Sequence, residues 1–239
     1  MTVSTRSAIR AVLIDLDGTL LDTVPDLARA ADAMLEAMGR AALGQERVRA
    51  FVGKGIPNLV RRCLAEGGGE PDASARAAAL EAFRRHYAAV NGSRTTVYPG
   101  VIEGLKALRA RGLPLGCVTN KAEEFARPLL ALKGLAGYFR ALVCGDTLPQ
   151  AKPDPAPLLH LCRALGAQPA NTVHIGDSIN DVQAARAAGI RVLCVPYGYN
   201  EGRDVRSLDC DAIVAGLDEA ADFIARVEDR TGPAFSEPS

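Results

Sequence analysis

The sequence predicts an α/β protein: a Rossmann-like, doubly wound parallel sheet core with an inserted all-helical cap subdomain. Three observations predict this fold. From residue 93 onward, short apolar runs alternate with helical patterns, which is typical of right-handed βαβ units in a parallel sheet. A run of the same kind begins at Ala11. Between these two parts, residues 23–92 show helical periodicity and no strand pattern.

The first strand is expected over 11–15. Its residues are apolar without alternation, as in a strand that is buried on both faces. Two carboxylates, Asp15 and Asp17, end the run, and Gly18 and Thr19 follow them. Burying unpaired carboxylates in a core is costly, so we expect both at the carboxyl end of the strand, where the sheet opens onto a crevice.

The inserted region is expected to hold four helices. Asp22 or Thr23 is the candidate cap of the first, Pro25 lies near its first turn, and Gly39 ends it. The other three are expected over 45–51, 56–64 and 73–90. We therefore place the helical cap at 23–92, the α/β catalytic core at 1–22 and 93–228, and a flexible tail at 229–239.

The core repeats a strand and a helix until the tail. After the first strand, the strands are expected at 115–119, 141–144, 172–176, 191–195 and 212–214. The helices are expected at 99–110, 123–132, 157–165, 181–188 and 217–226.

Composition excludes several functional classes. The 239 residues include 28 basic and 28 acidic side chains, so no net charge attracts nucleic acid or an anionic membrane. No apolar run reaches the length of a membrane span, and the first residues lack the apolar segment of a signal peptide, so a cytoplasmic protein is expected. The six cysteines form no C-x-x-C pair and are expected to be reduced core residues. Monomer and homo-oligomer both remain open.

Polar side chains follow four of the predicted strands. Beyond Asp15 and Asp17 they are Thr119, Asn120 and Lys121, then Lys152, and finally Asp177 and Asp181. Because the carboxyl ends of parallel strands share one edge, we expect these side chains to converge on one crevice. Four carboxylates there require a cation, and oxygen ligands favour Mg²⁺. A phosphoryl group would then be the anionic partner of Thr119 and Lys152.

These residues carry a family resemblance. The pattern D-x-D-G-T, a Ser/Thr closing the second strand, a loop lysine and G-D-x-x-x-D resemble the four motifs of the haloacid dehalogenase-like superfamily, across roughly residues 10–225. The resemblance implies that Asp15 is a nucleophile forming an aspartyl-phosphate and that Asp17 is the general acid/base. It implies Mg²⁺ ligands at Asp15, at the Asp17 backbone carbonyl and at Asp177, with Asp181 orienting the metal's waters.

The same resemblance assigns phosphate binding and reaction class. Thr119, Asn120 and Lys152 would hold the phosphoryl oxygens, with Lys121 as a minor competitor for the loop lysine. The second carboxylate, Asp17, followed by Gly-Thr, favours phosphoryl transfer over dehalogenation. His174, inside a strand, is expected to be a core residue or a neighbour of the site rather than a ligand.

A narrower resemblance concerns the substrate. Six segments resemble bacterial phosphoglycolate phosphatases: residues 22–27, 52–55, 58–60, 97–101, 144–149 and 197–200. This implies a small phosphorylated metabolite, 2-phosphoglycolate, hydrolysed to glycolate and phosphate. The cap loop Gly53, Lys54 and Gly55 is expected to set specificity, because the helix after it would point its N-terminus at the substrate carboxylate; a solvated Lys54 is the alternative. Another small monoester such as a sugar phosphate, a phosphomutase reaction, and a non-catalytic binding protein on the same fold also remain open.

Overall fold

The structure, a computed structural model, describes residues 8–229 and confirms the predicted α/β fold. Its main sheet has the strand order β5-β4-β1-β6-β7-β8, with every neighbouring pair parallel. The six strands are β1 (Ala11–Ile14), β4 (Leu115–Val118), β5 (Ala141–Val143), β6 (Thr172–Gly176), β7 (Arg191–Cys194) and β8 (Ala212–Ile213). Since β4 and β6 flank β1 on opposite sides, the strand order reverses beside β1, where ligands bind in open α/β sheets.

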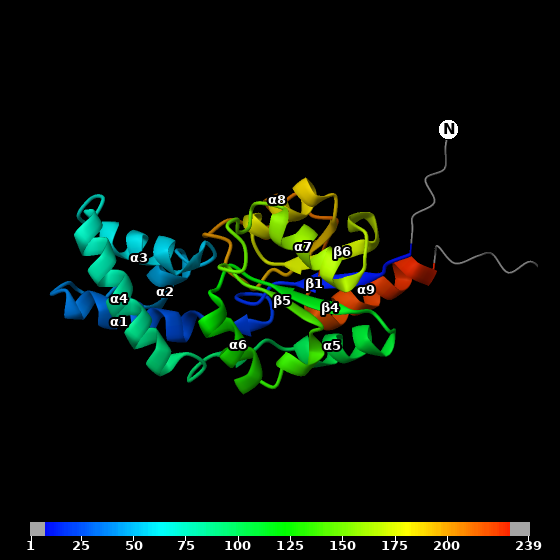
Figure 1. Cartoon of the computed structure of the whole chain (residues 1–239), viewed down its shortest axis with the longest axis horizontal. Coiled ribbons are helices and arrows are strands. Elements are labelled where there is room, and N and C mark those ends of the chain that lie inside the picture. The colour runs from blue at the N-terminus through cyan, green and yellow to red at the C-terminus, as the bar shows by residue number, and fades with distance from the viewer. Residues whose placement is uncertain (1–7, 230–239) are drawn as a thin grey trace, which may run out of the picture.

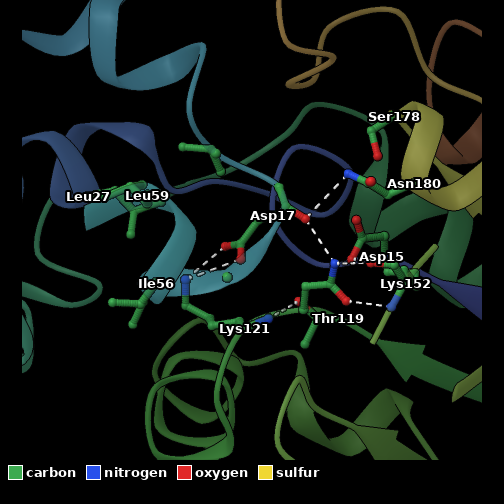
Figure 2. Close-up of a pocket in the computed structure, with 14 residues that line it drawn as sticks. Asp15, Asp17, Leu27, Ile56, Leu59, Thr119, Lys121, Lys152, Ser178 and Asn180 are labelled. Carbon is green, nitrogen blue, oxygen red and sulfur yellow. Dashed lines mark hydrogen bonds and ion pairs between the residues drawn. The ribbon is translucent and has the colours of Figure 1, made fainter. Parts of the chain in front are cut away.

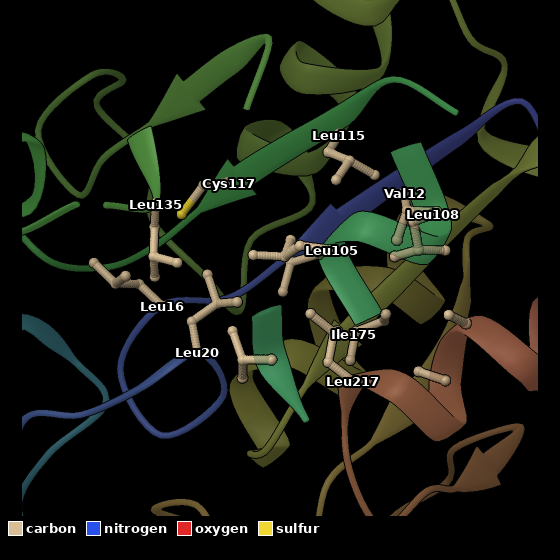
Figure 3. Packing of buried hydrophobic residues seen from close by; sticks show 14 of the residues in the cluster. Val12, Leu16, Leu20, Leu105, Leu108, Leu115, Cys117, Leu135, Ile175 and Leu217 are labelled. Atoms are coloured by element: carbon tan, nitrogen blue, oxygen red, sulfur yellow. The ribbon is translucent and has the colours of Figure 1, made fainter. Parts of the chain in front are cut away.

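Helices cover both faces of this sheet (Figure 1). One face carries α5 (Val101–Ala110), α6 (Glu123–Leu132) and α9 (Leu217–Asp229), and the other carries α7 (Ala156–Leu165) and α8 (Ile179–Ala188). Alternate residues of β1 explain its unbroken apolar run. Val12 and Ile14 pack in the cluster that includes Leu105 and Leu217 (Figure 3), whereas Ala11 and Leu13 pack with the residues of α7 and α8.

Four further helices form a lobe beside the sheet (Figure 1). They are α1 (Val24–Ala37), α2 (Gln45–Arg49), α3 (Gly55–Ala65) and α4 (Ala73–Val90). Their buried side chains form a cluster of their own, in which the sheet-side region contributes only Phe125 and Tyr199 among the buried members. The domain limits at residues 23 and 92 stay a prediction. Helix α9 extends through Asp229, and the rest of the expected tail, 230–239, lies outside the described residues.

One small sheet was not predicted. β2 (Leu21–Asp22) and β3 (Thr96–Val97) pair antiparallel where the chain enters and leaves the lobe. Two residues are too few to produce a periodic pattern, and the partners lie about seventy residues apart in the chain. The short 3₁₀ helices η1 (Ala136–Tyr138), η2 (Pro169–Asn171) and η3 (Val205–Ser207) were likewise not predicted. The helices predicted over 73–90 and 123–132 have the observed bounds, and the other predicted helices differ from the observed ones by a few residues at one or both ends.

The structure describes all six cysteines. All six cysteines are free; five are buried, as predicted, whereas Cys210 is only half-buried. Burial raises the pKa of Cys63 to about 12, so this thiol stays protonated at neutral pH.

Across residues 8–229, no helix is both long enough and apolar enough to cross a bilayer.

Asp26 ties the first helix of the lobe to the segment that leaves it. Its fully buried carboxylate accepts hydrogen bonds from the backbone N–H groups of Gly92, Arg94 and Thr95 and from the hydroxyls of Ser93 and Thr95, at 2.7–3.0 Å. Burial opposes the charged form. The hydrogen bonds from Thr95, Arg94 and Ser93 outweigh burial and hold the pKa of Asp26 below its usual value.

We expect Asp26→Ala to lower the free energy of unfolding by about 3 kcal/mol, because it orphans several buried donors at once. Asp222→Ala, on an exposed position of α9, is the matched control and should change little. Because the pKa of Asp26 is lower in the folded state, its contribution is present above the unfolded pKa of about 4 and is lost as the pH falls below it. Urea unfolding of the wild-type protein and both variants at pH 7 and at about pH 3 measures this. Equal effects of the two variants at pH 7 would refute the anchoring role.

Candidate active site

The predicted polar residues do converge. Asp15 directly follows β1, Thr119 follows β4, Lys152 lies in the loop after β5, and Asp177 follows β6. All four are buried at the carboxyl edge of the sheet, beside β1 (Figure 2 shows the first three). The parallel register brings these segments together, since β1 pairs with β4 on one side and with β6 on the other.

Lys152 is the cation at the centre of the cluster. Its Nζ lies 2.8 Å from Asp15 Oδ1 and 2.7 Å from Asp181 Oδ1, and it donates to the Val118 carbonyl at 3.1 Å. Three acceptors use the three hydrogens of one ammonium. Burial disfavours this charge, but Asp15 and Asp181 outweigh burial and raise the pKa of Lys152 above its usual value. The lysine therefore stays charged inside the protein.

Both carboxylate oxygens of Asp181 contact hydrogen-bond donors. Its Oδ1 accepts from Lys152 and lies 2.9 Å from Nε2 of His174, and its Oδ2 accepts from the Ser178 hydroxyl at 2.7 Å and the Ser178 N–H at 3.2 Å. Burial opposes its charge, but Lys152 and His174 outweigh burial and hold its pKa well below normal. Because a carboxylate only accepts, Nε2 of His174 must carry the hydrogen. His174 is thus a buried neighbour of the site, as expected.

The contacts of Asp15 and Asp177 offset their burial less completely than those of Asp181 do. Burial, the charge of Asp181 and their mutual repulsion raise the pKa of Asp177 well above normal. Burial also raises the pKa of Asp15 to about 7, although Lys152 works against this shift. Oxygen atoms of Asp15, Asp177 and Asp181 lie within 4.8 Å of one another. Three carboxylates share one lysine there, and their oxygen donors fit a hard divalent cation.

Gly18 makes this arrangement possible. Its φ of +88° turns the chain sharply after Asp17, and a Cβ there would lie 2.4 Å from Oδ2 of Asp177. The next residue, Thr19, donates its hydroxyl to Oδ1 of Asp177 at 2.8 Å. Gly18 therefore leaves room for the carboxylate of Asp177, and Thr19 holds it, although Asp177 comes 158 residues after Thr19 in the chain.

Asp17 has a partner that the sequence left ambiguous. The ammonium of Lys121 lies 3.0 Å from Oδ1 and 3.3 Å from Oδ2 of Asp17 (Figure 2). Lys121 is 4% exposed, so it is as buried as Lys152. The sequence indicated Lys121 as a candidate site residue, because it comes two residues after Thr119 in the same loop. Spacing alone could not distinguish a solvated lysine from this ion pair.

A cavity opens between the cluster and the lobe. Its polar wall contains the predicted residues Asp15, Asp17, Thr119, Asn120 and Lys152, together with Lys121, Ser178 and Asn180. The lobe closes the other side with Leu27, Val52, Ile56 and Leu59 and with the backbone of Gly53 and Gly55. Sequence reasoning missed Ser178 and Asn180, although both lie between Asp177 and Asp181 in the fourth motif.

Asn120 joins the cavity's two walls. Its side-chain amide donates to the Gly53 carbonyl at 2.9 Å and to the Lys152 carbonyl at 2.8 Å, and its Oδ1 accepts from the Lys152 N–H at 2.9 Å. Asn180 also donates to the Gly53 carbonyl, at 3.4 Å. The Asn120 side chain therefore fixes the loop of Lys152 against the Gly53 turn.

Lys54 does not line the cavity. Its ammonium lies 3.1 Å from Oε1 of Glu201, which Arg62 also contacts at 3.0 Å, and its side chain is 42% exposed. The prediction that Lys54 faces the substrate is therefore not supported by its position. Glu201 lies 147 residues away, so nothing local in the sequence indicated this pairing.

Tyr199 is another contact that the sequence did not reveal. Its hydroxyl accepts from the N–H groups of Thr23 at 2.7 Å and Val24 at 3.2 Å, at the start of α1, and its own backbone N–H donates to Asp177. The hydroxyl of Thr23, a candidate cap, makes no capping hydrogen bond to α1. The cap of α1 is thus supplied by a residue after β7.

The fold and the site define an α/β protein with buried carboxylates and lysines around a cavity at the carboxyl edge of its parallel sheet. The family of haloacid dehalogenase-like hydrolases matches residues 9–189, so the chain belongs to that family. A relative from Nitrosospira multiformis, called phosphoglycolate phosphatase, is 55% identical over 219 residues, which cover 91% of this chain and 96% of the relative. A protein of the same name from Thiobacillus denitrificans is 50% identical with the same coverage.

Solved structures agree with the fold. The crystal structure of a "predicted phosphoglycolate phosphatase" from Haemophilus somnus has a TM-score of 0.84 at 28% identity and covers 93% of this chain and 99% of its own. A CbbY protein from Rhodobacter sphaeroides, solved in complex with phosphate, has a TM-score of 0.75 at 24% identity, which shows a shared fold. The match spans both the sheet and the helical lobe.

Proposed function

We propose that this protein is a Mg²⁺-dependent phosphatase that hydrolyses 2-phosphoglycolate to glycolate and phosphate through an aspartyl-phosphate. The phosphatase assignment is supported by the cluster of Asp15, Lys152 and Asp177 at the carboxyl edge of the sheet. The substrate assignment rests on relatives that bear the name phosphoglycolate phosphatase at 50–55% identity over nearly their full length.

In the first half-reaction, a carboxylate oxygen of Asp15 attacks the phosphorus of the ester. The bond from phosphorus to the glycolate oxygen breaks, and that oxygen takes the electron pair and a proton from the carboxyl group of Asp17. The 3.0 Å ion pair with Lys121 places Asp17 on the cavity wall beside Asp15. Glycolate then leaves with its proton.

In the second half-reaction, Asp17 acts as the base. Its carboxylate removes a proton from water, whose oxygen attacks phosphorus and releases the Asp15 carboxylate and inorganic phosphate. Thr119, the backbone at Asn120 and Lys152 hold the phosphoryl oxygens during both steps, because fixed donors stabilise charge that grows in the transition state. The buried ammonium of Lys152 needs no rearrangement to do so.

The metal would be held by Asp15, the carbonyl of Asp17 and Asp177. When bound, Mg²⁺ would neutralise carboxylate and phosphoryl charge at this edge of the sheet. The raised pKa values of Asp15 and Asp177 support a cation there, since both carboxyl groups carry a burial cost that Lys152 alone does not offset. Asp181, whose two oxygens already accept four hydrogen bonds, would act by orienting Lys152 and the metal's waters rather than as a ligand.

The lobe would select the leaving group. The apolar side chains of Leu27, Val52, Ile56 and Leu59 enclose the cavity and favour a small alcohol. Gly55 and Ile56 line it at the first turn of α3, where no side chain caps the helix. The N–H groups of that turn are the proposed partners of the glycolate carboxylate.

A panel of phosphate monoesters tests the substrate. With Mg²⁺ present, we expect kcat/KM for 2-phosphoglycolate to exceed that for ethyl phosphate and for hexose phosphates by about 100-fold, which corresponds to one well-placed charged contact of about 3 kcal/mol. Ethyl phosphate is the matched control, because it has a similar size and lacks the carboxylate.

If a sugar phosphate gave a higher kcat/KM than 2-phosphoglycolate, that sugar phosphate would become the proposed substrate, and the proposed chemistry would stand. Formation of an isomeric sugar phosphate instead of free phosphate would point to a phosphomutase. Wild-type protein that hydrolyses none of the esters would favour a non-catalytic binding protein on this fold.

A further inference from the structure

Lys121 is a buried charge to which the proposed mechanism gives no chemical role. Its ammonium touches both oxygens of Asp17, and its side chain is 3% exposed. On its other side, Nζ lies 5.0 Å from the centre of the Tyr87 ring, which belongs to α4 of the lobe. Burial disfavours this charge, but Asp17 and Tyr87 outweigh burial and raise the pKa of Lys121 above its usual value.

The backbone of Lys121 is held at both ends of the residue. Its N–H donates to the Thr119 hydroxyl at 3.1 Å, and its carbonyl accepts from the Gly145 N–H at 2.9 Å. The Tyr87 ring is braced in turn by Phe125, at 4.8 Å between ring centres. Lys121 thus joins a fixed loop of the sheet region to a buried ring of the lobe.

Asp17 depends on this lysine for its orientation. Within residues 8–229, Lys121 is the partner with which the Asp17 carboxylate forms an ion pair, and the contact to both oxygens fixes the plane of the carboxyl group. We propose that Lys121 is the positioning residue that orients the Asp17 carboxyl group toward the leaving-group oxygen. This inference rests on the acid/base role proposed for Asp17.

The contact makes the effect specific to one step. Lys121 holds the Asp17 carboxyl group through both oxygens, at 3.0 and 3.3 Å, and Asp17 acts on the leaving oxygen only while the ester bond breaks. Removal of the ammonium therefore leaves Asp17 free to rotate away from that oxygen, which slows the step that needs a correctly oriented acid. Lys152 cannot supply this effect, because its three hydrogens are directed at Asp15, Asp181 and the Val118 carbonyl.

Leaving-group dependence tests the proposal. Lys121→Met is assayed with 2-phosphoglycolate, ethyl phosphate and p-nitrophenyl phosphate, and kcat/KM is compared because it reports only the steps up to departure of the alcohol. The two alkyl esters need a proton on the leaving oxygen, whereas p-nitrophenolate leaves without one. We expect a loss of about 100-fold for both alkyl esters and of less than about 10-fold for p-nitrophenyl phosphate, in line with the usual size of general acid catalysis.

Two comparison variants sharpen the result. Asp17→Asn should lose more activity with the two alkyl esters than with p-nitrophenyl phosphate, as Lys121→Met does. The double variant Lys121→Met, Asp17→Asn should be no slower than Asp17→Asn alone, since the lysine acts through the aspartate. Lys106→Met, at an exposed position of α5, is the control for replacing a lysine by methionine. Lys121→Gln is measured in parallel, and the ratio between substrates cancels any difference in the folded fraction.

Two outcomes overturn the proposal. Equal losses for all three esters would make Lys121 a structural residue. A rise in KM for 2-phosphoglycolate with ethyl phosphate unaffected would make it the binding partner of the carboxylate instead. If wild-type protein rejects 2-phosphoglycolate but hydrolyses the other two esters, the substrate assignment fails while the comparison of ethyl and p-nitrophenyl phosphate still decides the role of Lys121.

Discussion

Asp15→Asn is expected to lower kcat by a factor on the order of 10⁴ or more with every phosphate ester, because an amide cannot form the phosphoryl-enzyme bond. The fold should survive. Burial raises the pKa of Asp15 to about 7, so its charge costs stability at neutral and higher pH, and an uncharged amide of similar size removes that cost. We therefore expect an equal or higher Tm for the variant.

Asp146→Asn is the matched control for this loss. Asp146 also follows a strand of the sheet, but its side chain accepts from the Glu123 N–H outside the cavity. It should retain nearly full activity. Substantial hydrolysis by folded Asp15→Asn protein would remove Asp15 from the role of nucleophile, whatever the substrate.

Removal of divalent cations is expected to have the second largest effect. Chelation should lower the hydrolysis of 2-phosphoglycolate by at least about 1,000-fold, and Mg²⁺ should restore it, since the cluster of Asp15, Asp177 and Asp181 has three carboxylates and one compensating lysine. A second readout needs no substrate. Mg²⁺ should raise the Tm of the wild-type protein, because an ion that binds only the folded state stabilises that state.

Asp177→Asn separates the ion site from a general salt effect. It should weaken or abolish the rise of Tm with Mg²⁺, whereas Asp222→Asn, on the exposed face of α9, should leave the rise unchanged. Asp177 is also linked to Thr19 and to the Tyr199 backbone, so the Tm of each variant is compared with and without the ion. Full activity after thorough chelation would contradict a metal at this position.

Much of the site was predictable because its residues follow strands. An apolar run without alternation predicted β1, and the rule that parallel strands end at one edge predicted that Asp15, Thr119, Lys152 and Asp177 lie close together. The helix over 73–90 was predicted with its observed bounds, and in the structure the side chain of Asp72 caps it. These features depend on local sequence and on general rules of topology.

The remaining contacts depend on pairings across the chain. Lys121 and Lys54 both lie in loops that the sequence associated with the site, yet Lys121 is buried against Asp17, whereas Lys54 is exposed and pairs with Glu201. Spacing cannot distinguish these outcomes, because each is decided by what another segment brings near. The capping of α1 by Tyr199 is of the same kind, since it joins residues more than 170 positions apart.

Rapid-quench analysis with 2-phosphoglycolate radiolabelled in its phosphoryl group, in the presence of Mg²⁺, tests whether Asp15 forms an aspartyl-phosphate. We expect label to enter the protein during the first turnover, to reside on the peptide containing Asp15 and to be released by hydroxylamine, as an acyl phosphate is. Phosphate released in the first turnover without any labelled protein, or label on a peptide that lacks Asp15, would rule out the aspartyl-phosphate at Asp15.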